Sequence, residues 1–176
     1  MSSFLLTISI EGEFISIPKE ISNPDDYDFD HPSSLDFDYM LECLKKLEKR
    51  EDTEVPNYCF VTHSRLPEKK LVKSADIIIF EGLLCMHDER IRDMYDLKLF
   101  VDYDTDLALA RRIKRDIAER GRDQKEVITR YMRFIKHDYV QFVLPQRNCV
   151  NFIVRGNPDN VNAIKLLGNF IKKKTS

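Results

Sequence analysis

Short apolar runs predict the strands of this chain. Two runs, residues 4–10 and 14–17, lie near its start, and only Glu11, Gly12 and Glu13 separate them. The unbroken run Ile-Ile-Ile-Phe at residues 77–80 is typical of a strand that is buried on both faces of a parallel sheet. The runs at 97–102 and 150–154 have the same character, so the pattern predicts a central sheet.

Helical periodicity fills most of the chain between these runs. A capping box of Ser33 and Asp36 predicts the start of the first helix. The predicted helices cover residues 37–47, 88–95, 106–120, 125–143 and 159–174, and in the last of them Val161, Ile164, Leu167 and Ile171 mark the inner face. Because strands and helices alternate, we expect an open α/β sheet with right-handed crossovers.

Two segments before residue 76 break this alternation. Residues 23–34 are polar and rich in carboxylates, which indicates a loop. Residues 55–65 alternate between apolar or aromatic and polar side chains, which predicts half of a β-hairpin that is completed near residues 70–72.

Composition narrows the class of protein. The chain has 176 residues, enough for one domain, and 28 Lys and Arg against 30 Asp and Glu, so no global basic field indicates a nucleic-acid partner. No stretch approaches a membrane span and no signal peptide is visible, so we expect a cytoplasmic protein without a membrane partner. The four cysteines have no metal-like spacing and are expected to be reduced.

Arginines share one face of the predicted helix at 106–120. Arg112, Arg115 and Arg122 fall at helical spacing, opposite an apolar stripe of Leu109, Ile113 and Ile117. Guanidinium groups suit phosphate because they donate two hydrogen bonds at once and keep their charge. The alternative is a solvated face with ordinary ion pairs, Arg112 with Asp116 and Arg115 with Glu119.

Several motifs resemble uridine-cytidine kinases of the phosphoribulokinase and uridine kinase family. Over residues 28–171 and in the family's order, the chain contains FDHPSSLD, VPNYCFVTHSR, IIIFEGLL, RRIKRDIAERGRD, Leu144-Pro145 and VRGNPDNVNAI. The resemblance implies a P-loop-kinase-like open, mainly parallel sheet flanked by helices, with a β-hairpin substrate segment. It implies a single domain over residues 1–176, in which 25–75 bind the nucleoside and 76–176 hold the core strands, the arginine lid and the C-terminal helix.

The resemblance also assigns a nucleoside site. Asp30 of FDHP matches the position that binds the ribose hydroxyls, and an ionised carboxylate can accept from two hydroxyls at once. Tyr58, Phe60 and His63 match the positions around the pyrimidine. The alternative for these three is a hairpin that packs on its own domain, with His63 as a surface imidazole.

The expected phosphate and metal groups follow from the same resemblance. Arg112, Arg115, Arg120 and Arg122 match the family's lid, whose charges can stabilise a transferred phosphoryl group. Glu81 matches the acidic position near magnesium, and a loop or capping acid is its alternative interpretation. ATP and Mg²⁺ are therefore the expected cofactors, and a pyrimidine nucleoside is the expected ligand.

The phosphate-binding loop itself is missing. The sequence has no G-x-x-x-x-G-K-[ST] motif, and no glycine precedes Lys-Ser or Lys-Thr. A parallel crossover needs at least about a dozen residues, but only residues 11–13 link the first two runs. These runs therefore form a Gly12 hairpin, or one leaves the sheet, and residues 1–24 are a degenerate or rebuilt first βαβ unit.

Other positions also depart from the family. Glu20 aligns with the family's catalytic base but lacks its aromatic partners, so it is either a longer base or an ordinary loop glutamate. Arg130 stands where the family carries glutamine, and Lys136-His137 replaces Lys-Pro.

The sequence leaves three functional hypotheses. The first is a uridine or cytidine kinase of pyrimidine salvage that is impaired as a stand-alone catalyst. The second is a pseudokinase that binds nucleoside and associates, as a homo-oligomer or hetero-oligomer, with an active homologue. The third is an incomplete gene model of an active kinase.

Overall fold

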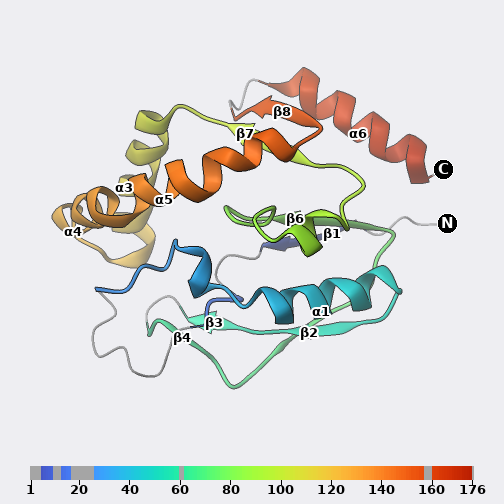
Figure 1. Cartoon of the computed structure of the whole chain (residues 1–176), viewed down its shortest axis with the longest axis horizontal. Helices are drawn as coiled ribbons and strands as arrows, with labels where there is room; N and C mark the ends of the chain where they lie inside the picture. Colours follow the sequence, from blue (N-terminus) through green and yellow to red (C-terminus); the bar gives the residue numbers. More distant parts are fainter. Residues whose placement is uncertain (1–4, 10–12, 17–25, 60–61, 157–159, 176) are drawn as a thin grey trace.

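Two pairs of parallel strands form the central layer of the protein. The structure is a computed structural model that describes residues 5–9, 13–16, 26–59, 62–156 and 160–175. Strand β1 (Leu5–Ser9) pairs in parallel with β6 (Ile77–Glu81), and β7 (Leu99–Asp102) pairs in parallel with β8 (Phe152–Arg155). The predicted strands in these regions are confirmed, and helices lie on either side of them (Figure 1).

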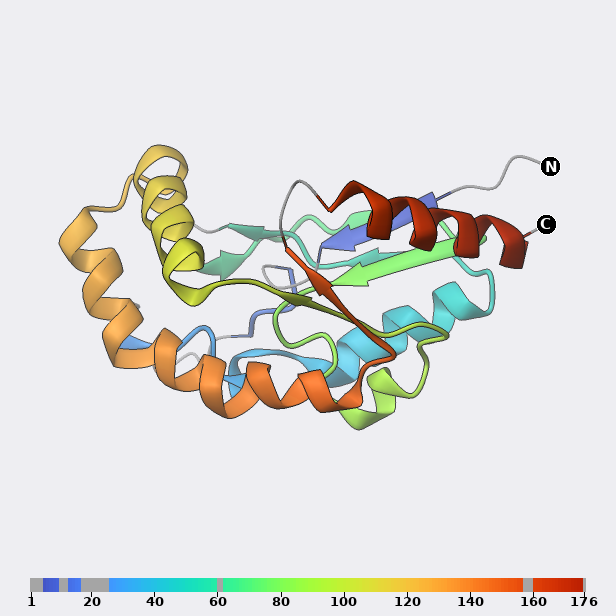
Figure 2. The same cartoon turned by 90° about the horizontal axis from the view of Figure 1, so that it is seen from above.

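Helices account for most of the rest of the described chain. They are α1 (Phe37–Glu48), α2 (Glu89–Arg92), α3 (Thr105–Arg120), α4 (Gln124–Arg130), α5 (Lys136–Asp138) and α6 (Val161–Thr175). Two wider π-helical turns, Tyr131–Ile135 and Tyr139–Val143, continue α4 and α5 into one long helical segment, which the sequence predicts as a single helix. In both views α3 and α4 lie at one end of the molecule and α6 at the other (Figures 1 and 2).

The hairpin region consists of two short antiparallel ladders. Strand β2 (Thr53–Val55) pairs with β5 (Lys70–Val72), and β3 (Tyr58–Cys59) pairs with β4 (Ser64–Arg65). The predicted closure of the hairpin near residues 70–72 is therefore confirmed.

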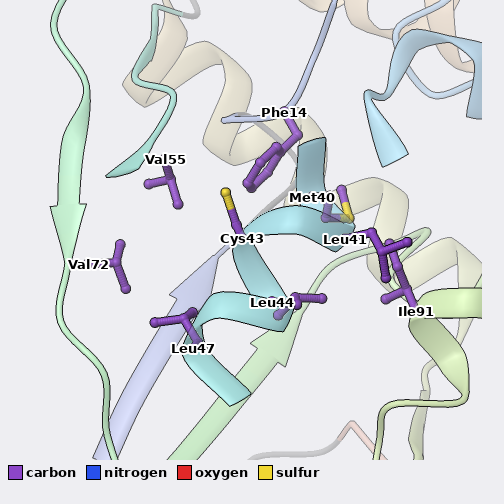
Figure 3. Close-up of a cluster of buried hydrophobic side chains, with 9 residues drawn as sticks. All are labelled: Phe14, Met40, Leu41, Cys43, Leu44, Leu47, Val55, Val72 and Ile91. Carbon is purple, nitrogen blue, oxygen red and sulfur yellow. The ribbon is translucent and has the colours of Figure 1, made fainter. Parts of the chain in front are cut away.

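The main core forms around one face of α1. Leu41, Leu44 and Leu47 recur at helical spacing and are buried, as the sequence predicts. They pack with residues from β2, β5 and α2 in a cluster that Figure 3 shows as sticks: Phe14, Met40, Leu41, Cys43, Leu44, Leu47, Val55, Val72 and Ile91. Asp36 caps this helix by accepting from the Tyr39 N–H at 3.1 Å, whereas Ser33 belongs to the preceding 3-10 turn, Pro32–Ser34.

The second apolar run leaves the sheet, which is one of the two alternatives for it. Phe14 and Ile15 are buried, and Ile15 forms an isolated antiparallel bridge with Leu35. The Asp36 N–H donates to the Phe14 carbonyl at 3.0 Å, so this run lies beside the start of α1. Gly12 lies outside the described residues.

The expectation that the parallel strands are buried on both faces is wrong. Ile78 and Phe80 of β6 pack against the main core, but Ile79 between them is exposed. On β7, Phe100 is buried and Val101 is 64% exposed, and Phe152 on β8 is 55% exposed. Ile153, which alternates with Phe152 on β8, is 47% exposed as well, so the β7–β8 pair has exposed apolar side chains on both faces.

The inner face of α6 also differs from its prediction. Leu167 and Ile171 are half-buried as expected, but Val161 and Ile164 are exposed. Leu166 and Phe170 of α6 are exposed as well, so only part of its apolar surface is covered by the described residues. None of the described helices is both long and apolar enough to span a membrane.

Candidate functional site

Tyr58 and His63 line one pocket beside the hairpin. The pocket encloses about 390 Å³, including space open to solvent, and its lining residues are Ile15, Ser16, Tyr58, His63, Ser64 and Arg65. The cavity volume that compares with known sites is about 170 Å³, which is below the roughly 300 to 1,000 Å³ that is usual for small-molecule sites. The structure therefore brings together two of the three predicted pyrimidine residues, while Phe60, like Glu20, lies outside the described residues.

Tyr58 is a buried neutral phenol in this pocket. Burial raises the pKa of Tyr58 to about 12, the nearby Cys59 and Tyr27 add to the rise, and the positive charge of Arg122 opposes it. The electrostatic effect of Arg122 indicates that the end of the arginine helix lies close to the pocket.

His63 connects the pocket to the FDHP segment. Its backbone has a positive φ of 50°, which turns the chain between β3 and β4. The ring stacks on Phe29, with ring centroids 4.9 Å apart and planes inclined by 24°. Phe29 directly precedes Asp30, so the predicted base-binding and ribose-binding residues are neighbours in space.

Asp30 reaches the arginine helix. Its Oδ2 lies 3.6 Å from Nη2 of Arg112 in α3. The predicted ribose ligand and the predicted lid are therefore in contact, although they are far apart in the sequence.

Asp116 organises the arginines of α3. It is buried, and its Oδ1 accepts from Nε of Arg115 at 2.9 Å and lies 3.4 Å from Nη1 of Arg120. Nε of Arg112 faces its Oδ2 at 3.6 Å. If the helix face were only a solvated face with ordinary ion pairs, Arg112 would pair with Asp116 and Arg115 with Glu119. The first of these ion pairs is present, but Arg115 contacts Asp116 and not Glu119.

Three guanidinium groups thus share one buried carboxylate. With Asp30 included, three positive charges face two negative charges, and the cluster keeps a net positive charge that could attract an anion. Burial lowers the pKa of Arg120, and the charge of Arg115 lowers it further. Arg122 lies just beyond α3 and faces Glu126 at 3.8 Å.

Glu81 stands apart from this cluster. It is the exposed last residue of β6 and pairs in register with Ser9, the last residue of β1. The described residues contain no group of three or more His, Cys, Asp or Glu side chains arranged to hold a metal ion. Residues 10–12, which follow β1 where a phosphate-binding loop would begin, lie outside the described residues.

Two residues that the sequence does not assign to the site hold it together. Arg130 is buried, donates to the Tyr27 carbonyl at 3.1 Å and has its guanidinium 5.5 Å from the Phe29 ring. The sequence already shows that Arg130 stands where the family carries glutamine, but it does not predict these contacts. Phe29 was visible only as the neighbour of Asp30, and nothing in the pattern predicted its stacking on His63.

The chain is similar to known nucleoside kinases along most of its length. The sequence profile of the Phosphoribulokinase / Uridine kinase family matches residues 3–163. Uridine-cytidine kinase A of Dictyostelium discoideum is 39% identical over 97% of this chain and 34% of its own length. Uridine-cytidine kinase B of the same organism is 40% identical over 85% of this chain and 62% of its own length. The chain therefore spans between about a third and two thirds of these relatives.

Solved structures agree on the fold. A phosphoribulokinase from Rhodobacter spheroides superposes with a TM-score of 0.62 at 17% identity, covering 87% of this chain and 60% of that chain. A possible uridine kinase from Bacillus stearothermophilus superposes with a TM-score of 0.56 at 11% identity, covering 86% of this chain and 72% of that chain. The predicted α/β kinase-like fold is confirmed.

Proposed function

Because the chain belongs to the Phosphoribulokinase / Uridine kinase family, we propose that it binds a pyrimidine nucleoside, uridine or cytidine, and is severely impaired as a stand-alone kinase. Asp30 accepts from the ribose hydroxyls, and Tyr58, Phe60 and His63 surround the base. Family membership and the similarity to uridine-cytidine kinases support the ligand class.

One observation carries the nucleoside half of this proposal. Arg112 contacts Asp30, and Phe29 beside Asp30 stacks on His63 in the pocket that Tyr58 also lines. Two separate sequence motifs, FDHP and the hairpin, therefore converge on one place together with the arginine helix. Asp30 is half-buried and faces Arg112, and a carboxylate placed to accept from two ribose hydroxyls loses one of these hydrogen bonds with deoxyribose, so Asp30 favours ribose.

The catalytic half is supported by what the sequence lacks. Phosphoryl transfer depends on positioning and on electrostatic stabilisation, and the motif that supplies both for the donor phosphates is absent. The arginines at Arg112, Arg115 and Arg120 could stabilise phosphoryl charge, but Asp116 already offsets part of their charge. Arg122, Glu81 and Glu20 remain candidate groups for the same reaction.

Calorimetry with uridine, deoxyuridine and ATP tests the proposal. We expect uridine to bind, deoxyuridine to bind at least about tenfold more weakly, and ATP not to bind, because Asp30 is retained and the phosphate loop is absent. Asp30→Asn should weaken uridine and leave deoxyuridine nearly unchanged. The nucleoside half fails if neither nucleoside binds, and uridine-dependent ATP turnover at roughly 1 to 100 per second refutes the catalytic half.

Exposed apolar side chains on the parallel strands favour a second candidate function, that of a regulatory partner of an active homologue. Ile79, Val101 and Phe152 are exposed apolar side chains on strands of a kind that helices usually cover on both faces. Mixing the chain with an active uridine-cytidine kinase tests this function. A heavier species in size-exclusion chromatography and altered kinase activity support it, and unchanged elution with unchanged activity counts against it.

A further inference from the structure

A short 3-10 turn, Pro32–Ser34, follows the FDHP motif and leads into α1. The Ser34 N–H donates to the His31 carbonyl at 2.9 Å, and the Leu35 N–H donates to the Pro32 carbonyl at 3.1 Å. Pro32 and Ser34 are buried. The backbone that comes directly after Asp30 therefore has a defined conformation, which the turn maintains.

The hydroxyl of Ser34 ties this turn to both neighbours of Asp30. Ser34 is 0% exposed, and its Oγ lies 2.8 Å from the Phe29 carbonyl oxygen and 2.8 Å from the His31 carbonyl oxygen. A hydroxyl has one hydrogen, so the two carbonyls share it. The Ser34 carbonyl in turn accepts from the N–H of Ser16 at 2.7 Å, and Ser16 lines the candidate pocket. The turn thus fixes the backbone on both sides of Asp30 relative to the pocket wall.

The His31 side chain caps the start of the turn. Its backbone is extended, with φ −74° and ψ 141°, and its Nδ1 accepts from the Ser33 N–H at 3.1 Å. The Ser33 Oγ lies 2.8 Å from the same nitrogen. Ser, Thr, Asp and Asn usually supply the oxygen that makes such a cap. A ring nitrogen that accepts from an N–H carries no proton itself, so this cap requires a neutral imidazole with its proton on Nε2.

The same ring also packs against the long helical segment. The His31 ring meets Phe142 edge to face with centroids 4.8 Å apart, and Phe142 lies in the π-helical turn Tyr139–Val143. The cap needs an acceptor atom at Nδ1, whereas the packing contact needs a flat ring. These two contacts therefore depend on different properties of His31, and different substitutions can separate them.

We propose that His31 is a positioning residue of the nucleoside site. Its neutral imidazole caps the turn that follows Asp30, and the capped turn holds the Asp30 carboxylate where the ribose hydroxyls reach it. Without the acceptor at Nδ1, the Ser33 N–H loses its partner and the turn is held less firmly. His31 acts through Asp30, so this role rests on the proposed function, which makes Asp30 the ribose ligand.

Two substitutions of His31 test which contact matters. His31→Phe keeps a flat ring beside Phe142 and removes the acceptor, and it should weaken uridine binding about fivefold, the effect of one neutral hydrogen bond. Deoxyuridine should lose less, because it makes fewer hydrogen bonds to Asp30, so the preference for uridine falls. His31→Asn removes the ring and keeps an oxygen that accepts at the N-cap, so it should keep the wild-type preference. Calorimetry with both nucleosides measures these affinities.

An exposed histidine provides the matched control. The His137 side chain is 73% exposed and lies beside Asp138, so His137→Phe should keep the wild-type affinities for uridine and deoxyuridine. If His31→Phe keeps the wild-type preference for uridine, the positioning role is refuted. If His31→Asn loses as much of the preference as His31→Phe, the ring and not the cap positions Asp30, and the proposal is likewise refuted.

A measurement without ligand separates this inference from the proposed function. Nitrogen-15 NMR of the imidazole groups at about pH 8, where a free imidazole is neutral, should find His31 with a proton on Nε2 and none on Nδ1. A proton on Nδ1 would refute the cap. If Nδ1 carries no proton and the wild type binds neither nucleoside, the cap stands, and the proposed function and the role of His31 in binding are both refuted.

Discussion

Arg65 joins the hairpin to the start of α1. Its Nη2 donates to the Phe14 carbonyl at 2.9 Å, and its Nη1 lies 3.3 Å from Oδ2 of Asp36, the N-cap of α1. The residue also lines the candidate pocket beside Tyr58 and His63. The arginine of the THSR motif therefore fixes the position of the pocket wall, which is a structural task within a motif of functional residues.

Replacing Arg65 tests this task. Arg65→Ala should lower the free energy of unfolding by about 2 kcal/mol, because it removes hydrogen bonds to a carbonyl and to a charged cap in a partly buried place. Arg50→Ala is the matched control, since Arg50 pairs with Asp76 at an exposed site and should contribute less than about 1 kcal/mol. Urea denaturation measures both, and equal small losses would contradict the assigned role.

The arginines of α3 surround the buried carboxylate of Asp116. Asp116 accepts from or faces three arginines spaced along the helix, and Gly121 ends the helix with a positive φ of 64°. This arrangement fixes the arginines before any anion binds. An incoming phosphate group would compete with Asp116 for them, so the carboxylate limits as well as organises the cluster.

The Asp116→Asn variant tests the organisation of the helix. It should lower the free energy of unfolding by about 2 kcal/mol, less than for a fully buried ion pair, because the three guanidinium groups are partly exposed. Glu119→Gln is the control on the same helix and should change stability by less than about 0.5 kcal/mol, because Glu119 is exposed. If thermal or urea unfolding shows no loss of stability in Asp116→Asn, the role of Asp116 in organising the arginines is contradicted.

Burial is uneven across the parallel strands of the molecule. The main core forms around α1 and the hairpin, and Leu84, Met86, Phe100 and Val143 form a second buried cluster. Ile79, Val101, Phe152 and Ile153 on the same strands are exposed. In parallel sheets the crossover helices normally cover both faces, and here only residues 11–13 link the first two apolar runs.

A pair of matched substitutions tests whether Val101 on β7 is exposed in solution. Val101→Thr should change the free energy of unfolding by less than about 0.5 kcal/mol, because Val101 is 64% exposed. Val55→Thr should lower it by about 2 kcal/mol, because Val55 is 1% exposed and the new hydroxyl would be buried. If Val101→Thr lowered the free energy of unfolding as much as Val55→Thr does, Val101 would be buried in solution.

Local periodicity and motifs determined the order of strands and helices, the hairpin, the α1 face of Leu41, Leu44 and Leu47, and the missing phosphate loop. These features depend on neighbouring residues, so a single sequence carries them. The stacking of Phe29 on His63, the contact of Asp30 with Arg112 and the place of Arg130 join segments far apart in the chain. Only tertiary packing decided those contacts, because no local pattern encodes which distant side chains meet.

The same reason explains the exposed apolar side chains of the strands. The run at residues 77–80 has the composition of a strand buried on both faces, and that composition is unchanged when the element that would cover it is missing. Apolar character predicts that a side chain favours burial, but the surrounding elements decide whether it is buried. The sequence thus determined which segments are strands, and the tertiary structure decided which of their side chains the described residues cover.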